Sequence, residues 1–187
     1  MSDTTADATT APEYELTISL TRKPDALQFR ELLAWTGEET ARWEEWLRAQ
    51  DPAVLAVSLG DSKYATVGDL IFHVFMVERR YTERLHDEEA TPYESVPHAT
   101  LDEIFAVHRD NRPRLERWVD TAPEEEWARV LTFETISAGT LQASKRKIVA
   151  HTLMHGVRHW AQIAMAVRQA GYPTTWMHDI LMSGALS

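Results

Sequence analysis

The sequence predicts an all-α protein, a four-helix bundle with a short hairpin or an extended crossover before its last long helix. Three observations support this class. Four long segments carry apolar residues at helical spacing, their ends carry helix start or stop signals, and one lengthy connection precedes the fourth segment. The 187 residues suit a single domain, which we expect to span 14–187 after a flexible acidic tail at 1–13.

The first predicted helix covers about residues 25–50 and ends at Asp51-Pro52, because the residue before a proline avoids the α region. Its apolar faces include Trp35, Trp43 and Trp46. We interpret these tryptophans as core residues, with the wall of a ligand pocket as the alternative.

The second predicted helix covers about residues 66–86, and Thr66 with Asp69 resembles a capping box at its start. The third covers about residues 100–120 and begins with a second capping box. Pro113 lies in its middle, which predicts a kink or a break because proline lacks the N–H that a helix interior needs.

The fourth predicted helix covers about residues 144–170, with Ser144 as its cap and Gly171 as its stop. Residues 129–143, before it, are rich in β-formers and predict the hairpin or extended crossover. We expect a short terminal helix over 176–186. The four long helices together favour an antiparallel bundle.

Composition excludes several classes of function. The formal charge of −10 disfavours broad nucleic-acid binding, because the chain repels phosphate backbones. The chain has no cysteine, which excludes disulfides, thiolate metal sites and a cysteine nucleophile. Neither a signal peptide nor an apolar run of about 20 residues is recognisable. We therefore expect a cytoplasmic protein with a small-molecule substrate and no nucleic-acid or membrane partner; its tryptophan content is compatible with a homodimer.

Three histidines of the fourth helix, His151, His155 and His159, follow one another at four-residue spacing and share one helical stripe. In the second helix, His73 occupies a similar seam position. Both seams have the spacing of a core-facing ridge. Several buried imidazoles without partners would each cost a few kcal/mol, and a divalent metal ion would satisfy them together. Spacing alone does not choose between the pairs 151/155 and 155/159.

Other site templates do not fit. A zinc-protease HExxH motif, a G-x-S-x-G elbow and a glycine-rich phosphate loop are absent from the sequence. Only Glu83-Arg-Leu-His86 has the E-x-x-H spacing of a di-iron bundle, which needs two such motifs. We interpret the remaining histidines as surface or cleft residues: His86, His98, His108 and His178.

The segment His155-Gly-Val-Arg-His159-Trp-Ala-Gln162 resembles the last helix of the DinB/YfiT-like family, which carries H-x-x-x-H-R-x-Q there. The stretch 71–81 resembles the family's second helix. The resemblance implies a four-helix bundle with a three-His divalent-metal site formed by His73, His155 and His159, and leaves His151 an auxiliary place. The sequence departs from the pattern at Trp160-Ala161, and its arginine stands at 158. Gln162 is kept, as a part of the site or as a polar seam residue.

The family includes enzymes that use low-molecular-weight thiols (glutathione, mycothiol or bacillithiol) and proteins linked to stress and DNA damage. We therefore expect a metal-dependent enzyme, most simply a thiol-dependent transferase or a hydrolase, with Zn²⁺ favoured over Ni²⁺ or Fe²⁺. The alternative is a non-catalytic metal-binding stress or DNA-damage-response protein, with His151 as fourth ligand. A helical interaction module without metal is the third interpretation. No general base can be named.

Three arginines of the second helix, Arg79, Arg80 and Arg84, are interpreted as solvated surface charges. The alternative is contact with an anionic thiol or carboxylate.

Overall fold

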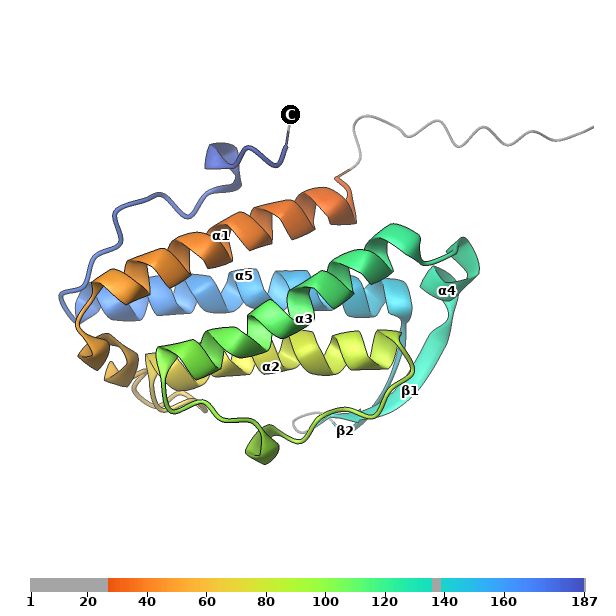
Figure 1. Ribbon diagram of the computed structural model, residues 1–187, viewed down its shortest axis with the longest axis horizontal. Coiled ribbons are helices and arrows are strands. Elements are labelled where there is room, and N and C mark those ends of the chain that lie inside the picture. The colour runs from red at the N-terminus through yellow and green to blue at the C-terminus, as the bar shows by residue number, and fades with distance from the viewer. Residues whose placement is uncertain (1–26, 136–138, 187) are drawn as a thin grey trace, which may run out of the picture.

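The computed structural model of the chain describes residues 27–135 and 139–186, so the predicted tail at 1–13 lies outside the described residues. The predicted class is confirmed: four long helices form a bundle, and a two-stranded hairpin precedes the last of them (Figure 1). The long helices are α1 (Phe29–Ala49), α2 (Val67–Leu85), α3 (Leu101–Thr121) and α5 (Lys145–Gln169). The short elements are η1 (Pro52–Ala56), η2 (Tyr93–Ser95), α4 (Glu124–Ala128), β1 (Val130–Thr135), β2 (Gly139–Ser144) and η3 (Ile180–Met182).

Local side-chain caps fix where the helices begin. At the start of α2, the Thr66 hydroxyl accepts a hydrogen bond from the Asp69 N–H (3.2 Å), and the Asp69 carboxylate accepts one from the Thr66 N–H (3.0 Å). Thr100 and Glu103 form the same reciprocal box at α3. Helix α1 begins at Phe29, later than predicted, because the Gln28 N–H donates to Glu31 (2.7 Å) and makes Gln28 the cap.

The end of α5 follows the predicted stop signal. Gly171 has a φ of 90°, a left-handed conformation that favours glycine. The N–H of Tyr172 then reaches back to the Val167 carbonyl (2.8 Å), and the N–H of Gly171 reaches the Arg168 carbonyl (3.1 Å). This pair of bonds is a Schellman motif, which satisfies carbonyls at the helix end.

Helix α3 continues through Pro113 from Leu101 to Thr121, so the predicted break does not occur. The buried side chains of Asn111, Arg112 and Leu115 flank the proline, and Pro113 itself is exposed. Packing on both sides of the missing N–H holds the helix together, although proline alone would disfavour it.

The bundle is not antiparallel throughout, because α2 and α3 run side by side in the same direction (Figure 1). Phe75 contacts Phe105 and, farther along both helices, Glu78 contacts Asn111. The 86–100 connection makes this topology feasible: a chain of that length reaches about 50 Å when extended, whereas the 19 residues of α2 rise about 29 Å. The connection returns along the bundle and carries η2.

The hairpin lies against the C-terminal end of α2. Strands β1 and β2 pair antiparallel, from Val130 opposite Ser144 to Thr135 opposite Gly139. The rings of Tyr81 and Phe133 meet edge to face with centroids 5.8 Å apart. The crossover before α5 is therefore an ordered hairpin.

Trp43 and Trp46 lie in the core, as predicted for the first helix, whereas Trp35 is only partly buried and lies outside the core clusters. Trp43 is fully buried and stacks on Trp160 with centroids 5.1 Å apart. The predicted terminal helix over 176–186 is wrong beyond the single turn of η3, because this segment is held by side chains: Trp176 and His178 both hydrogen-bond to the buried carboxylate of Glu39.

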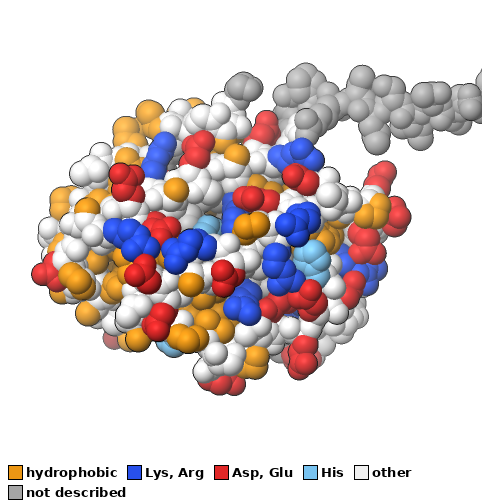
Figure 2. Space-filling model, viewed as in Figure 1, with side chains coloured by type: hydrophobic (Ala, Val, Ile, Leu, Met, Phe, Trp, Pro, Cys, Tyr) orange, Lys and Arg blue, Asp and Glu red, His pale blue; other side chains and the backbone are white. Residues whose placement is uncertain are grey.

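Basic and acidic side chains are interspersed on the face seen in Figure 2. Within the described residues, no helix combines the length and apolar character needed to span a bilayer.

Candidate metal centre

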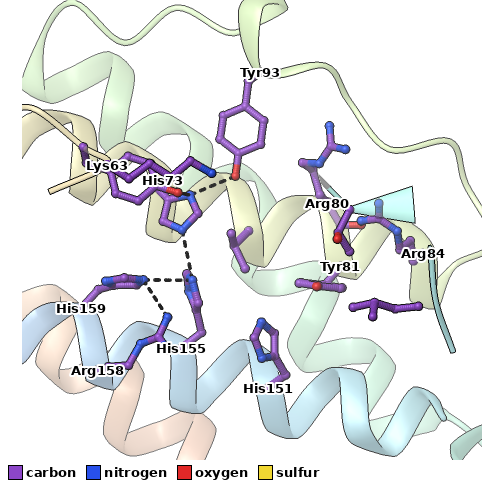
Figure 3. A pocket seen from close by; sticks show the side chains of 14 residues that line it. Lys63, His73, Arg80, Tyr81, Arg84, Tyr93, His151, His155, Arg158 and His159 are labelled. Atoms are coloured by element: carbon purple, nitrogen blue, oxygen red, sulfur yellow. Dashed lines mark hydrogen bonds between the residues drawn. The ribbon is translucent and has the colours of Figure 1, made fainter. Parts of the chain in front are cut away.

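Three imidazoles from two antiparallel helices converge at one point between α2 and α5 (Figure 3). His73 lies near the middle of α2, and His155 and His159 lie one turn apart on α5. The Nε2 atom of His155 is 3.1 Å from Nε2 of His73 and 3.0 Å from Nε2 of His159. The structure thus brings together the three histidines that the resemblance singled out.

This donor set fits a divalent ion. Imidazole nitrogens bind such ions at about 2.1 Å, so ligands that subtend about 90–110° at one ion lie roughly 3.0–3.4 Å apart. The two Nε2 separations fall within that range. In addition, the buried Nδ1 of His155 has no hydrogen-bond partner among the described residues, which leaves Nε2 as the atom through which this ring interacts.

Neighbouring groups orient the other two rings. The Nδ1–H of His159 donates to the Gln162 side-chain oxygen (2.6 Å), which places the proton on Nδ1 and leaves the Nε2 lone pair facing the cluster. Nδ1 of His73 lies 2.8 Å from the Tyr64 hydroxyl and 3.2 Å from the Tyr93 hydroxyl. Gln162 is thereby part of the site rather than a seam residue bonded to backbone.

The cluster is held in the neutral form that metal ions require. Burial, with the nearby charges of His159, Lys63 and Arg158, lowers the pKa of His73 to about 3. Burial and the neighbouring His159 and His73 lower the pKa of His155 to about 2. Burial also lowers the pKa of His159, against the opposing effect of its bond to Gln162. The imidazoles therefore carry free lone pairs at neutral pH.

A cavity of about 510 Å³ opens beside the cluster, a size suited to a small molecule. Its walls come from α2, α5, the hairpin and the connection that carries Tyr93. The phenols of Tyr64, Tyr81 and Tyr93 line it, and burial raises the pKa of each, so they are neutral hydrogen-bonding groups at neutral pH.

His151 lines the same cavity but lies outside the cluster. Its ring centroid is 5.3 Å from that of His155, and its side chain is exposed. It is not one of the three residues whose nitrogens all lie within 4.8 Å of one another. The auxiliary place expected for His151 agrees with this position.

The histidine stripe of α5 borders the core instead of facing it. His151 and Gln162, predicted on a core-facing ridge, are both exposed: His151 lines the cavity, and Gln162 hydrogen-bonds to His159. The ridge that fills the core lies beside the stripe and includes Leu153, Trp160 and Ile163. Trp160, the departure from the family pattern, thus packs on Trp43 in the core, while the Arg158 guanidinium lies 3.3 Å from Nε2 of His159.

Sequence reasoning identified the groups at the cavity only in part. We interpreted Arg80 and Arg84 as solvated surface charges, with contact to an anionic thiol or carboxylate as the alternative; both line the cavity, whereas Arg79 forms an ion pair with Glu83. The signal existed for Arg84, which follows His73 and Tyr81 in the seam of α2. No spacing signal existed for Tyr64 and Tyr93, because both lie outside the long helices.

The remaining histidines lie away from the cluster. His108 lies beside Glu78, His98 stacks on Phe72, and His178 contacts Glu39. His86 is exposed at the end of α2.

Comparison with known proteins identifies a family. A search of curated proteins finds no match. The model of the DinB family matches residues 20–183, which include all four long helices of the bundle. With this match and the three-histidine cluster, which fits a metal-binding protein, the chain belongs to the DinB family.

Proposed function

We propose that this protein is a metal-dependent enzyme that transfers thiols to small electrophiles or hydrolyses small substrates. His73, His155 and His159 would hold a divalent ion, for which Zn²⁺ is favoured and Ni²⁺ or Fe²⁺ are alternatives. The observation that carries the proposal is the convergence of three neutral Nε2 atoms at the wall of a 510 Å³ cavity. A closed structural site would be covered by a fourth protein ligand, whereas this cluster borders open space.

When bound, the ion would supply Lewis acidity that lowers the pKa of a coordinated thiol or water toward neutrality. The chain contributes the arrangement around it: Gln162 and the two tyrosines orient the imidazoles, and the cavity holds the second reactant. In thiol transfer, the sulfur forms a bond to the electrophilic carbon while the leaving group departs with its electron pair. The thiol proton leaves the sulfur in the same process; among the described residues no carboxylate lines the cavity to accept it, whereas the His151 imidazole does line it.

The first experiment measures metal content. Protein purified without a His-tag is analysed for bound metals beside two variants, His155→Gln in the cluster and the matched control His86→Gln outside it. We expect near-stoichiometric metal in the wild type and in His86→Gln, and a strong loss in His155→Gln. Metal far below stoichiometry in the wild type and unchanged by His155→Gln would favour an interaction module without metal.

The second experiment measures turnover. Metal-loaded protein is assayed with glutathione, mycothiol and bacillithiol against an epoxide and an alkyl halide, and without thiol against an ester. Product formation that is lost in His155→Gln and kept in His86→Gln would support the enzyme. Tight metal binding with no turnover of any pair would favour the non-catalytic stress-response alternative.

A further inference from the structure

The cavity beside the histidine cluster is positively charged. Four cationic residues line it, Lys63, Arg80, Arg84 and Arg158, and no aspartate or glutamate does so among the described residues. This is unusual surface for a chain whose formal charge is −10. A concave site lined by one sign of charge attracts small ions of the opposite sign.

These four cations also lack the partners that arginines have elsewhere in the molecule. On the outer faces, Arg48 pairs with Glu44 and Asp102, and Arg114 pairs with Glu88 (Figure 2 shows the mixed charges of one face). Within the described part of the chain, no carboxylate forms an ion pair with any of the four cavity cations. Their charge is available to a ligand.

Arg80 and Arg84 are held in place without being neutralised. Both guanidinium groups donate to backbone carbonyls: Arg80 to Thr91, and Arg84 to Arg80 (3.1 Å) and Glu134 (3.0 Å). Each also lies over an aromatic ring, Arg80 at 5.4 Å from the Tyr93 centroid and Arg84 at 5.3 Å from that of Tyr81. The carbonyls and aromatic rings fix the two guanidinium groups in position but supply no formal negative charge.

The two arginines stand one helical turn apart on α2 and are half-buried. Burial and the charge of Arg80 lower the pKa of Arg84 below its ordinary value. Two like charges side by side in a partly desolvated wall repel each other, and an anion placed between them would relieve that repulsion. Lys63 and Arg158 stand apart from this pair, near His73 and His159 respectively (Figure 3).

We propose that Arg80 and Arg84 form a subsite for the oxyanion group, a carboxylate or phosphate, of a small-molecule substrate whose reacting atom lies at the histidine cluster. Lys63 and Arg158 favour negative charge on that reacting atom. The inference deepens the proposed function and rests on it for the reacting end alone. The anion-binding end depends only on the guanidinium groups.

Calorimetric titration tests the subsite without turnover. Glutarate, glycerol phosphate and the uncharged glutaramide are titrated into the protein as purified and after metal loading. The variants are Arg80→Gln/Arg84→Gln and the control Arg117→Gln, which removes the same kind of charge from an exposed site on α3. We expect the double variant to bind the anions at least about tenfold more weakly, and Arg117→Gln to stay within about twofold.

The comparison of ligands identifies the anion. Tighter binding of glutarate than of glycerol phosphate would assign the subsite to carboxylates, and the reverse order would assign it to phosphates. Equal affinity for glutaramide, or unchanged anion affinity in the double variant, would overturn the proposal.

A charge-preserving variant separates binding from folding, because Arg84 also holds the hairpin through Glu134. Arg80→Lys/Arg84→Lys keeps both charges, so it should recover a part of the anion affinity if charge is what matters. Equal loss of affinity in the lysine and glutamine variants, with equally lowered melting temperatures, would assign the arginines a structural role and overturn the subsite. Anion binding to a protein that takes up no metal would contradict the proposed function while leaving the subsite intact.

Discussion

Helix α2 carries two buried polar clusters that differ in how their charges are balanced. Glu78 faces α3 and α1, where its carboxylate meets Arg112 at 2.9 Å and Asn111 at 3.2 Å. His73 lies about 140° away around the helix and faces α5 and the cavity. The cluster around Glu78 pairs an anion with a cation inside the protein, whereas the cluster around His73 gathers only lone pairs and neighbouring cations.

The difference separates a structural polar cluster from a candidate metal-binding one. Arg112 also donates to the Thr36 hydroxyl (2.8 Å) and to the Leu33 carbonyl, so it ties α1, α2 and α3 together. The pairing is not complete, since Asn111 Oδ1 lacks a hydrogen-bond partner among the described residues. The charge of Glu78 is nonetheless balanced by Arg112 inside the protein. The histidine cluster, in contrast, is complementary to a cation at its centre and an anion beside it.

The largest expected effect comes from breaking the ion-paired cluster around Glu78. Arg112→Met would leave the Glu78 carboxylate buried without its cation and should lower the free energy of unfolding by about 3–5 kcal/mol. Urea unfolding measures this. Arg114→Gln, two residues farther along α3, removes an exposed ion pair and should cost no more than about 1 kcal/mol. Equal costs for the two variants would contradict the structural role of Arg112.

Acid should weaken the same cluster. Burial alone would raise the pKa of Glu78, but Arg112, His108 and Asn111 outweigh it and lower the pKa from 4.5 to about 2. Since the folded state holds this proton less tightly than the unfolded state, the stabilisation is complete above about pH 4.5 and is lost as the pH falls toward 2. The loss is on the order of 3 kcal/mol. Unfolding measured across this window should show a flatter acid limb in Glu78→Gln than in the wild type.

A smaller effect is expected at Gln162, which orients one imidazole of the histidine cluster. Gln162→Met removes the acceptor that fixes the His159 ring and should weaken metal affinity by about 10–100-fold, because groups behind metal ligands typically contribute that much. Competition with a chromogenic chelator measures the affinity. Gln169→Met makes the same exchange at the exposed end of α5 and should change nothing. Identical affinities in both variants would show that Gln162 does not orient the ring.

The smallest effect is expected at His151. Its ring lies at the cavity wall and outside the three-histidine group, so His151→Gln should change metal affinity by less than about twofold. The same chelator competition applies. A loss comparable to that of His155→Gln would instead make His151 a fourth ligand and favour the closed, non-catalytic site.

Local signals explain why most of the fold was predictable. Thr66, Thr100, Ser144 and Gly171 act within one helical turn, so their pattern in the sequence fixes the ends of α2, α3 and α5. The direction of α3 depends on the path of a long connection and on contacts between residues distant in sequence, which no local pattern records. Pro113 shows the same limit, because packing around it overrides its local preference.

The candidate site divides in a similar way. The histidines were predictable because helical spacing gathers them on single faces, and the family resemblance chose among them. Tyr64 and Tyr93 could not be predicted, because irregular segments have no periodicity from which to infer where a side chain points. Arg84 shares the seam of His73 and lines the cavity. The spacing pattern does not show, however, whether a long cationic side chain at the edge of a seam points to solvent or into a cavity.

The placement of Tyr93 on the long connection has a consequence for how this architecture diversifies. The histidine cluster is anchored in helices whose packing tolerates little change, whereas part of the cavity wall belongs to a segment that can be lengthened, shortened or replaced. Exchanging residues 87–99 should therefore reshape the cavity wall and remove one of the two hydroxyls beside Nδ1 of His73, while His155 and His159 keep their places on α5. The same helical frame can in this way carry different cavity walls.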